Sequence, residues 1–392
     1  MADPDLAPTL AIIGGGQLAR MMAQPAIALG LPLRLLAEAE GVSAAQVIPD
    51  HTVGDYRDLQ TLREVTDGAA VVTFDHEHVP TEHLHALEEG GLAVRPGPAA
   101  LVFAQDKALM RERLGAMGVP CPRNAVVASV ADVEAFGFPC VLKTTRGGYD
   151  GKGVWVVRSA EDVAEPLAVA ERTGVRILAE ELVEFRRELS ALVARSPSGQ
   201  AAAYPVVQTT QLGGICHEVI APAPDLTDEL AGQAQQLALR IAGELGVTGI
   251  LAVELFETVD GRILVNELAM RPHNTGHWTQ DGAVTSQFEN HLRAVMDLPL
   301  GSPAPRERWS VMVNILGAEP RPDGGEVGRL YDGYPHALAR DPHLRVHLYG
   351  KSLRPGRKVG HVNTYGDDLD DCLERARHAA AWFRGDLGNE SE

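Results

Sequence analysis

The sequence predicts a protein of the α/β class whose later parts take on α+β character. Short apolar runs alternate with helix-like stretches over the first hundred residues, and such alternation is typical of a doubly wound parallel sheet. The apolar runs from 124 to 195 are strand-like instead. After 299 proline and glycine become frequent, and strand-like runs lead into a last amphipathic helix. We therefore expect domains at 1–107, 108–300 (with a smaller subdomain at about 124–183) and 301–392.

The expected elements follow one another in a simple order. In the first domain, strands are expected at 9–14, 31–38 and 69–74, with a helix that ends at Gly68. Gly118 and Pro120 close two short helices. Later strands are expected within FPCVLKTT, GVWVV, RILAEELV and ELSALVA, then a helix at 225–245, a β-hairpin at 249–270 and a helix in ENHLRAVMDL. LRVHLYG and KVGHVNTY are the last expected strands, and a helix at 367–384 closes the chain.

Composition excludes several classes of protein. The fractions of hydrophobic residues (45%) and charged residues (22%) are those of a globular chain. A net charge of −18 makes the surface a poor platform for nucleic acid. The sequence holds no apolar run of the ~20 residues that a membrane span needs, and its acidic start is unlike a secretion signal. Four widely spaced cysteines indicate buried thiols in a reducing cytoplasm rather than zinc or disulfide sites.

The first motif is the glycine-rich run Gly14–Ala19, which follows a strand and opens a helix. It matches G-x-G-x-x-A, and Glu38 lies about 20 residues further on, where a ribose-binding acid would stand. Taken alone, the motif suggests a nicotinamide-dependent dehydrogenase. The phosphate or ribose of another ligand and a purely structural turn are the alternatives.

A second glycine-rich segment, Lys143–Gly153, lies between two expected strands. Its glycines make a loop whose amides can wrap polyphosphate, and Lys143, Arg146 and Lys152 supply positive charge. No helix follows and the pattern is not GxxxxGK[ST], so the loop is not a Walker A motif. A plain hairpin turn is the alternative.

The expected hairpin at 249–270 carries the strongest signal. Asp260-Gly261 favours a two-residue turn that pairs Val259 with Arg262. That register places Glu254 directly across from Glu267, and two facing carboxylates repel each other. A divalent cation between them removes the repulsion, and Mg²⁺ suits carboxylates that also share substrate phosphates. A shared proton and a slipped register are the alternatives.

Three further segments carry polar groups suited to ligands. EELV at 180–183, followed by Glu188, offers strand-end backbone and a carboxylate for an adenine edge and a ribose, with solvated acidic residues after a strand as the alternative. Met270–Trp278 crowds polar donors beside the carboxylate hairpin, and its Arg271 can hold a small oxyanion with two hydrogen bonds. Lys351–His361 holds several cations in an acidic chain, which indicates a phosphate site, with a solvated surface turn as the alternative.

Together these pieces resemble the ATP-grasp superfamily and, within it, the family of 5-(carboxyamino)imidazole ribonucleotide synthases. GGGQLARM, TFDHEHVP, QDK, GGYDGKG, VNELAMRPHNTGHWT and RPGRKVGH carry the resemblance, which spans about 9–385. It implies a Rossmann-like N-terminal domain, a central ATP-grasp domain of two subdomains and a small C-terminal β-rich domain. The implied reaction uses ATP to convert bicarbonate into carboxyphosphate. The exocyclic amine of 5-aminoimidazole ribonucleotide (AIR) then takes up the carboxyl group, yielding ADP and phosphate.

The resemblance also implies a role for each matching residue. At the ATP site, Lys107 and Lys143 would meet the phosphates, and the lid would consist of Gly148, Tyr149, Asp150, Gly151, Lys152, Gly153 and Val154. Adenine would be bound by Glu180, Glu181, Leu182 and Val183, and the ribose by Glu188. Gln211 would also contact the nucleotide. Glu254 and Glu267, with Asn266, would hold Mg²⁺, or Mn²⁺ in its place. Arg271, His273 and Asn274 would hold bicarbonate or carboxyphosphate, and Asp150 could accept the amine proton. AIR would meet Gly15, Gln17, Leu18, Glu77, Tyr149, Lys152, Lys351, Arg354, Arg357 and Lys358. A cytoplasmic homodimer, joined through the N-terminal part, is implied as well.

The sequence departs from the family pattern in places. Thr209 and Gln211 stand where an Asn-x-His segment is expected, and Gln211 cannot carry charge. His76 and His78 stand where Phe and Asn are usual, and Val154 replaces a usual Gln. A formate-using ribonucleotide transformylase of the same superfamily and a non-catalytic nucleotide sensor remain alternative functions.

Overall fold

The N-terminal part is a parallel sheet, as the alternation of strands and helices predicts. The computed structural model describes residues 7–148, 151–317 and 329–386. The sheet runs β3 (His51–Val53), β2 (Leu33–Ala37), β1 (Leu10–Ile13), β4 (Val71–Phe74) and β5 (Ala93–Val94), and every neighbouring pair is parallel. The helices of this part are α1 (Gln17–Leu29), α2 (Leu59–Thr66) and α3 (Thr81–Glu89). β1 is buried along its whole length, as expected of a strand covered by helices on both faces.

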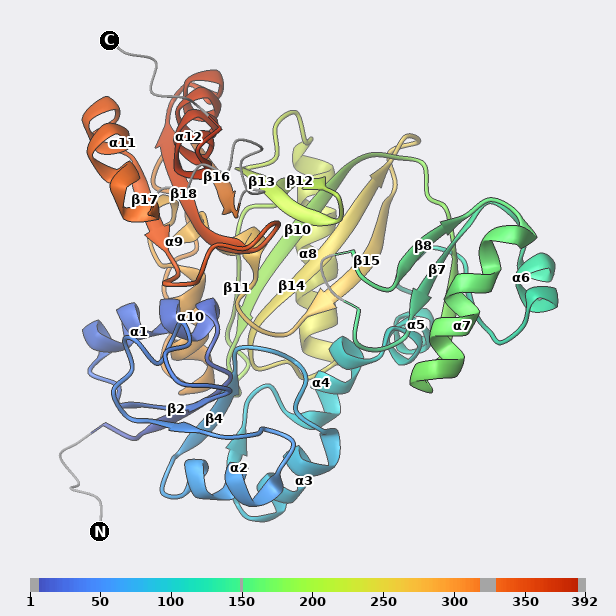
Figure 1. Ribbon diagram of the computed structural model, residues 1–392, viewed down its shortest axis with the longest axis horizontal. Helices are drawn as coiled ribbons and strands as arrows, with labels where there is room; N and C mark the ends of the chain where they lie inside the picture. The colour runs from blue at the N-terminus through green and yellow to red at the C-terminus, as the bar shows by residue number, and fades with distance from the viewer. Residues whose placement is uncertain (1–6, 149–150, 318–328, 387–392) are drawn as a thin grey trace.

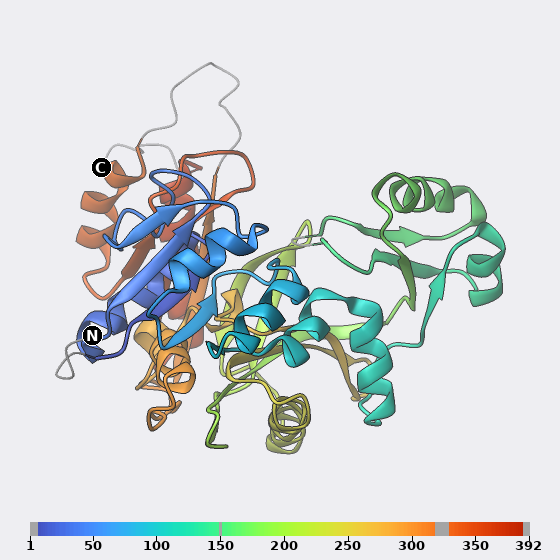
Figure 2. The ribbon, with the colours of Figure 1, turned by 90° about the horizontal axis from the view of Figure 1, so that it is seen from below.

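Two short helices lead from this domain to a small antiparallel subdomain, which projects to the right in Figures 1 and 2. The helices are α4 (Pro98–Gln105) and α5 (Lys107–Ala116). The subdomain's sheet runs β6 (Asn124–Val127), β9 (Ile177–Glu181), β7 (Cys140–Thr144) and β8 (Val154–Val157). It also contains α6 (Val130–Phe136), η1 (Ala160–Val163) and α7 (Ala164–Thr173), none of which the sequence predicted. Its apolar residues form a core of their own.

The large central sheet is antiparallel throughout and reaches into the C-terminal part. Its order is β15 (Ile263–Ala269), β14 (Gly249–Thr258), β10 (Phe185–Arg195), β12 (Val207–Leu212), β13 (Ile215–Ala221), β16 (Trp309–Leu316), β18 (Lys358–Gly366) and β17 (Arg345–Leu348), with β11 (Ala201–Ala203) paired to β10. The C-terminal β-rich region is therefore continuous with the central sheet, because β16 pairs with β13. The domain boundaries themselves stay predictions.

Helices cover this sheet on both sides (Figure 1). They are α8 (Asp228–Glu244), η2 (Asn274–Gly276), α9 (Thr279–Gly282), α10 (Gln287–Val295), η3 (Leu330–Gly333), α11 (Tyr334–Arg340) and α12 (Leu369–Arg384). α8 begins at its N-cap, where the Thr227 hydroxyl accepts from the Leu230 N–H. One core cluster joins residues of the N-terminal sheet, such as Ile13, to residues of α5, α8 and β14. A second joins α1 to α10. These shared cores fix the N-terminal domain against the central sheet.

Candidate active site

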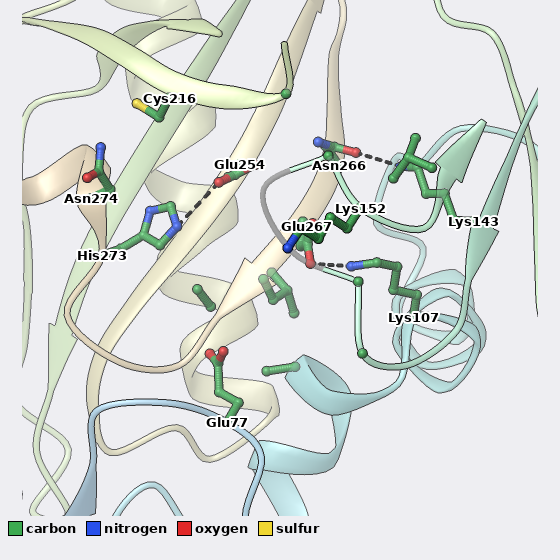
Figure 3. A pocket seen from close by; sticks show the side chains of 18 of the residues that line it. Glu77, Lys107, Lys143, Lys152, Cys216, Glu254, Asn266, Glu267, His273 and Asn274 are labelled. Atoms are coloured by element: carbon green, nitrogen blue, oxygen red, sulfur yellow. Dashed lines mark hydrogen bonds and ion pairs between the residues drawn. The ribbon is translucent and has the colours of Figure 1, made fainter. Parts of the chain in front are cut away.

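A cavity of about 1330 Å³ lies where the N-terminal domain, the small subdomain and the central sheet meet. Every described residue that the sequence proposes for the site lines this cavity, except Gly15 and Gly153. Tyr149 and Asp150 lie outside the described residues. Figure 3 shows side chains from α5, β7, β14, β15 and the 270–274 segment converging on the cavity. The fold thus gathers segments that are far apart in the sequence.

The two predicted carboxylates do face each other. Glu254 on β14 pairs directly with Glu267 on β15, and both line the cavity. The prediction of the pair is confirmed, but the predicted turn is wrong. Thr258, rather than Val259, closes the hairpin by donating its N–H to the carbonyl of Arg262 at 2.9 Å.

A β-bulge explains how a wrong turn gave the right pair. The register shifts by one residue between Glu254 and Leu255, since Leu255 pairs with Val265. The extra residue is Asn266, and the bulge leaves both Asn266 and Glu267 lining the cavity. A bulge of this kind re-aims a side chain beside an active site. The longer turn and the bulge shift the register in opposite senses, so their effects cancel at Glu254.

The pKa values of the two carboxylates are shifted in opposite directions. Burial, together with the charges of Glu267 and Glu188, raises the pKa of Glu254 to about 7. Burial also opposes ionisation of Glu267, but the charges of Lys107, Lys143 and Arg111, with the hydrogen bond from Lys107, together outweigh it and lower the pKa of Glu267. Lys107 and Glu267 form an ion pair, drawn as a dashed line in Figure 3. Lys107 is therefore held at the edge of the carboxylate pair.

Oxygen donors at this position suit a hard cation. Within the described part of the chain, no cluster of three or more His, Cys, Asp or Glu side chains is placed to hold a metal ion by itself. Two carboxylates that complete their shell with nucleotide phosphates match the way Mg²⁺ is bound at phosphoryl-transfer sites. The residues present therefore fit the magnesium site that the resemblance implies.

A buried ion network supports the bulge. The Arg111 side chain, which is 1% exposed, pairs with Glu180 and donates to the carbonyls of Val265 (2.8 Å) and Asn266 (2.7 Å). Glu180 also pairs with Lys143 at 2.6 Å. Spacing on α5 could have indicated Arg111, because Lys107 and Arg111 stand four residues apart on one helix face. The Glu180 carboxylate thus holds two cations while the residue lines the cavity, and its adenine-binding role stays a prediction.

Replacing Arg111 by leucine should lower the free energy of unfolding by about 3 kcal/mol, because the buried Glu180 carboxylate loses one of its two cations and the carbonyls of Val265 and Asn266 lose their donor. Chemical denaturation measures this effect. Arg340→Leu, which removes an exposed pair with Glu374, is the matched control and should cost under about 1 kcal/mol. Equal losses in the two variants would contradict the structural role of Arg111.

The segment after β15 places the anion-binding candidates. The Arg271 Nε donates to Glu77 at 3.1 Å, and the Met270 N–H donates to the same carboxylate at 2.7 Å. Glu77 therefore orients Arg271, in addition to lining the cavity. His273 Nε2 lies 3.4 Å from a Glu254 oxygen. Burial, with the charges of Arg271 and Lys358, holds the pKa of His273 well below its usual range, so that its ring is neutral.

The side-chain amide of Asn274 is buried without a hydrogen-bond partner among the described residues. This is true of both its oxygen and its nitrogen. Buried polar groups are almost always hydrogen-bonded in proteins. The side chain lines the cavity close to His273 (Figure 3), so a polar ligand entering the cavity can satisfy it.

In the glycine-rich loop after β1, two backbone amides donate to carboxylates of the same domain. The Gly15 N–H donates to Glu38 at 2.9 Å, and the Gly16 N–H donates to Asp75 at 3.1 Å. A Cβ added to Gly16 would lie 2.1 Å from an Asp75 oxygen. Glycine is thus needed for the approach of a carboxylate of the same domain. The dehydrogenase reading is wrong, because these amides, which would hold a dinucleotide phosphate, are already engaged.

Three other candidates also make internal contacts. Gly153 lies off the cavity and its carbonyl accepts from the Thr144 N–H at 2.9 Å. Arg146, one of the loop cations, pairs with Asp106 at 2.9 Å. Gln17, at the start of α1, accepts a hydrogen bond from the ammonium of Lys351. This last contact ties the basic 351–358 segment to the loop after β1.

Comparisons with known proteins agree with this geometry. The family model described as "Ribonucleotide synthetase preATP-grasp domain" matches 7–105, "ATP-grasp domain" matches 112–288, and "Phosphoribosylaminoimidazole carboxylase C-terminal domain" matches 310–375. N5-carboxyaminoimidazole ribonucleotide synthase of Mycobacterium tuberculosis is 55% identical over 96% of this chain and 88% of its own length. That of Corynebacterium ammoniagenes is 51% identical over 95% and 91%.

Solved structures are similar along their whole length. An ADP complex of an N5-carboxyaminoimidazole ribonucleotide synthetase has a TM-score of 0.87 and 36% identity, covering 99% of this chain and 100% of its own. The synthase of Aspergillus clavatus, in complex with ADP and 5-aminoimidazole ribonucleotide, has a TM-score of 0.86 and 29% identity, covering 96% and 98%. Given this identity over nearly its full length and the carboxylate pair that faces the cavity, the chain belongs to the N5-carboxyaminoimidazole ribonucleotide synthase family of ATP-grasp enzymes.

Proposed function

We propose that this protein uses ATP and bicarbonate to carboxylate the exocyclic amine of AIR, releasing ADP and phosphate. The observation that carries the proposal is the pair Glu254 and Glu267, which stands between a lysine-bearing end of the cavity and the Arg271–Asn274 segment. The names of the relatives and the ligands of the Aspergillus clavatus synthase support the same reaction. They favour it over the formate-using transformylase and over a nucleotide sensor.

The nucleotide would occupy the end of the cavity next to the small subdomain. Lys107 and Lys143 would meet its phosphates, since both ammonium groups lie beside the bulge of β15 (Figure 3). The rings of Phe185 and Phe256, stacked with centroids 4.9 Å apart, line the cavity and offer an apolar wall for adenine. The lining residues Gly148, Gly151, Lys152, Val154, Glu181, Leu182, Val183, Glu188 and Gln211 complete the proposed nucleotide site.

Glu254 and Glu267, with Asn266 beside them, would hold Mg²⁺, and Mn²⁺ could replace it. The ion would neutralise phosphate charge, which is what phosphoryl transfer chiefly requires. The chain's own residues do the rest. Lys107 and Lys143 align the phosphates, and Arg271, His273 and Asn274 hold bicarbonate in line with the terminal one. Because carboxyphosphate hydrolyses readily, a loop that closes over the cavity would protect it from water.

AIR would lie at the opposite end, between α1 and the basic 351–358 segment. Lys351, Arg354, Arg357 and Lys358 line this end of the cavity together with Gln17 and Leu18. Phosphate on a small substrate suits such a cluster. Tyr149 and Asp150, proposed to close over AIR and to accept the amine proton, lie outside the described residues. Gly15 is off the cavity and would act through the fold of its loop alone.

The proposal is tested by leaving out one substrate at a time. ADP release should require bicarbonate and AIR together, and ¹³C-bicarbonate should give a carbamate carbon signal on AIR. Formate should not replace bicarbonate. ADP release that needs only bicarbonate would overturn AIR as the acceptor, and transfer of formate would overturn the reaction itself.

Arg357→Ala should raise the KM for AIR about tenfold or more and leave kcat within a fewfold, because uniform binding of the substrate phosphate is lost. The Arg357 guanidinium donates to the Ser352 hydroxyl at 2.8 Å and to the Ser352 carbonyl at 3.3 Å, so the loop also loses these two internal contacts. Steady-state kinetics with AIR varied at saturating ATP measures the effect. An unchanged KM for AIR would place the substrate phosphate elsewhere.

A cytoplasmic location and a homodimer joined through the N-terminal part are further proposals that follow from the family. In the described ranges, no helix is both long enough and apolar enough to cross a membrane. Gel filtration with light scattering tests the dimer, and a mass of one 41.9-kDa chain would contradict it.

A further inference from the structure

The side-chain amide of Gln287, at the start of α10, has only one possible orientation. It is wholly buried, and its Oε1 accepts from the His273 N–H at 2.8 Å, while its Nε2 donates to the His273 carbonyl at 2.7 Å. A backbone N–H can only donate and a carbonyl can only accept. The two contacts therefore assign the oxygen and the nitrogen of this amide without ambiguity.

That orientation fixes the proton on a second histidine. The Gln287 Nε2 also lies 2.9 Å from Nδ1 of His277. Because Nε2 is a donor, Nδ1 of His277 must accept, and a neutral imidazole then carries its proton on Nε2. Burial, with the nearby charges of Lys358 and Arg271 among others, holds the pKa of His277 well below its usual range, which agrees with a neutral ring.

The fixed N–H of His277 is an unsatisfied donor at the cavity. His277 is wholly buried, its Nε2 has no partner among the described residues, and the residue lines the same cavity as Asn274. Leaving a buried donor unpaired is destabilising. An oxygen acceptor supplied by a ligand would remove this cost.

We propose that His277 is a further catalytic residue, whose neutral Nε2–H binds an oxygen of the carbonate-derived anion, and that Gln287 is the positioning residue that fixes its tautomer. The proposal rests on the proposed function. When the AIR amine attacks carboxyphosphate, a nitrogen–carbon bond forms and the carbon–oxygen bond to phosphate breaks with its electron pair leaving on phosphate. The amine loses one proton, which Asp150 is proposed to accept first, and that proton ends on the departing phosphate, which leaves as HPO₄²⁻. A neutral donor stabilises the developing charge on the carbon-bound oxygen without giving up its proton.

One neighbour offers a rival explanation. His361, whose ring centroid lies 5.0 Å from that of His277, also has a buried Nε2 without a partner among the described residues. Its Nδ1 lies 2.7 Å from the Tyr349 hydroxyl. A water shared by the two imidazoles would make His277 purely structural, and the experiment must separate this case from anion binding.

The direct test is ¹⁵N NMR of protein labelled with [¹⁵N]histidine, with the His277 signals assigned by their loss in His277→Gln. The expected wild-type spectrum has a protonated Nε2 and a bare Nδ1, and Nε2 shifts when bicarbonate is added to the ADP complex but not with ADP alone. A proton on Nδ1, or an Nε2 that ignores bicarbonate, would overturn the proposal. This readout does not depend on turnover.

Kinetics supply the second test. His277→Leu and Gln287→Glu should each lower kcat about 100-fold, as expected for one lost oxyanion donor, with KM for ATP and AIR within twofold. In Gln287→Glu, the carboxylate cannot donate to Nδ1 of His277, so the proton of the His277 ring moves from Nε2 to Nδ1. His277→Gln keeps an amide donor near the Nε2 position and should stay within about tenfold of wild type. His361→Gln is the control and should remain near wild type.

Equal losses of kcat in the His277 and His361 variants would favour the shared water and contradict the proposal. Wild-type kinetics in His277→Leu would contradict it as well, because the imidazole would then not be needed. If wild-type protein itself shows no bicarbonate-dependent turnover, the proposed function fails instead. The NMR measurement on unaltered protein decides the tautomer even where the Gln287 variant does not fold.

Discussion

Glu267→Gln is expected to lose turnover by about a thousandfold or more while keeping its fold. Glutamine keeps the shape of the side chain but removes the charge from one of the two opposed carboxylates, so a cation between them loses one anionic ligand. It also removes the ion-pair partner of Lys107, an ammonium that would otherwise be aligned on the nucleotide phosphates. Both changes act on the phosphoryl-transfer step, where charge neutralisation and alignment supply most of the catalysis.

The measurement is kcat for ADP release, with thermal unfolding as the check on folding. Asp260→Asn on the same hairpin is the matched control. Among the residues that the structure describes, Asp260 bonds only to the turn residues Thr258 and Arg262, the latter at 2.7 Å, and it does not line the cavity. This control should retain wild-type turnover. Wild-type turnover in Glu267→Gln itself would remove the metal role from the pair.

Arg271→Lys is expected to lower kcat by about 10² to 10³, although charge is conserved. The guanidinium uses Nε on Glu77 (3.1 Å) and one terminal nitrogen on the Pro272 carbonyl (3.2 Å), and its planar fork can still face an anion with its remaining N–H groups. A lysine ammonium is a single point charge. It cannot satisfy Glu77 and hold an oxyanion with two parallel hydrogen bonds.

The loss should appear in the bicarbonate dependence and leave the KM for AIR within a fewfold. Arg345→Lys provides the control, since Arg345 is exposed and lies on the separate small hollow beside Asp281. Lysine at 271 with full activity would mean that charge alone is sufficient there, and the bidentate role would be withdrawn.

Much of the fold follows from local pattern in the sequence. Buried apolar runs predict β1, β2 and β4, and cap residues place helix ends to within a few residues, as at α8 (Asp228–Glu244) against the predicted 225–245. α6 and α7 escaped prediction, since both lie in a stretch read as strands. The joining of β16 to β13 depends on pairing between distant strands, which periodicity does not encode.

The site also has parts that the sequence predicts and parts that it does not. The carboxylate pair was predictable from hairpin register. The prediction missed both the longer turn closed by Thr258 and the bulge at Asn266, and these two shifts of register cancel at Glu254. The contacts of Glu77 with Arg271 and of Gln287 with His277 join residues that no spacing rule connects. The glycine-rich loop at Gly14–Ala19 suggested a dinucleotide site for a physical reason. A glycine needed for the approach of Asp75 looks the same in sequence as one needed for a phosphate.

Glu254 and Glu267 should hold one divalent cation between them when nucleotide is bound. Anomalous scattering from Mn²⁺, in crystals grown with ADP, locates that cation. We expect one strong anomalous peak within coordinating distance of both carboxylates, at about 2.0–2.3 Å from their oxygens. A nucleotide-bound crystal whose manganese peak lies away from one or both carboxylates would contradict it.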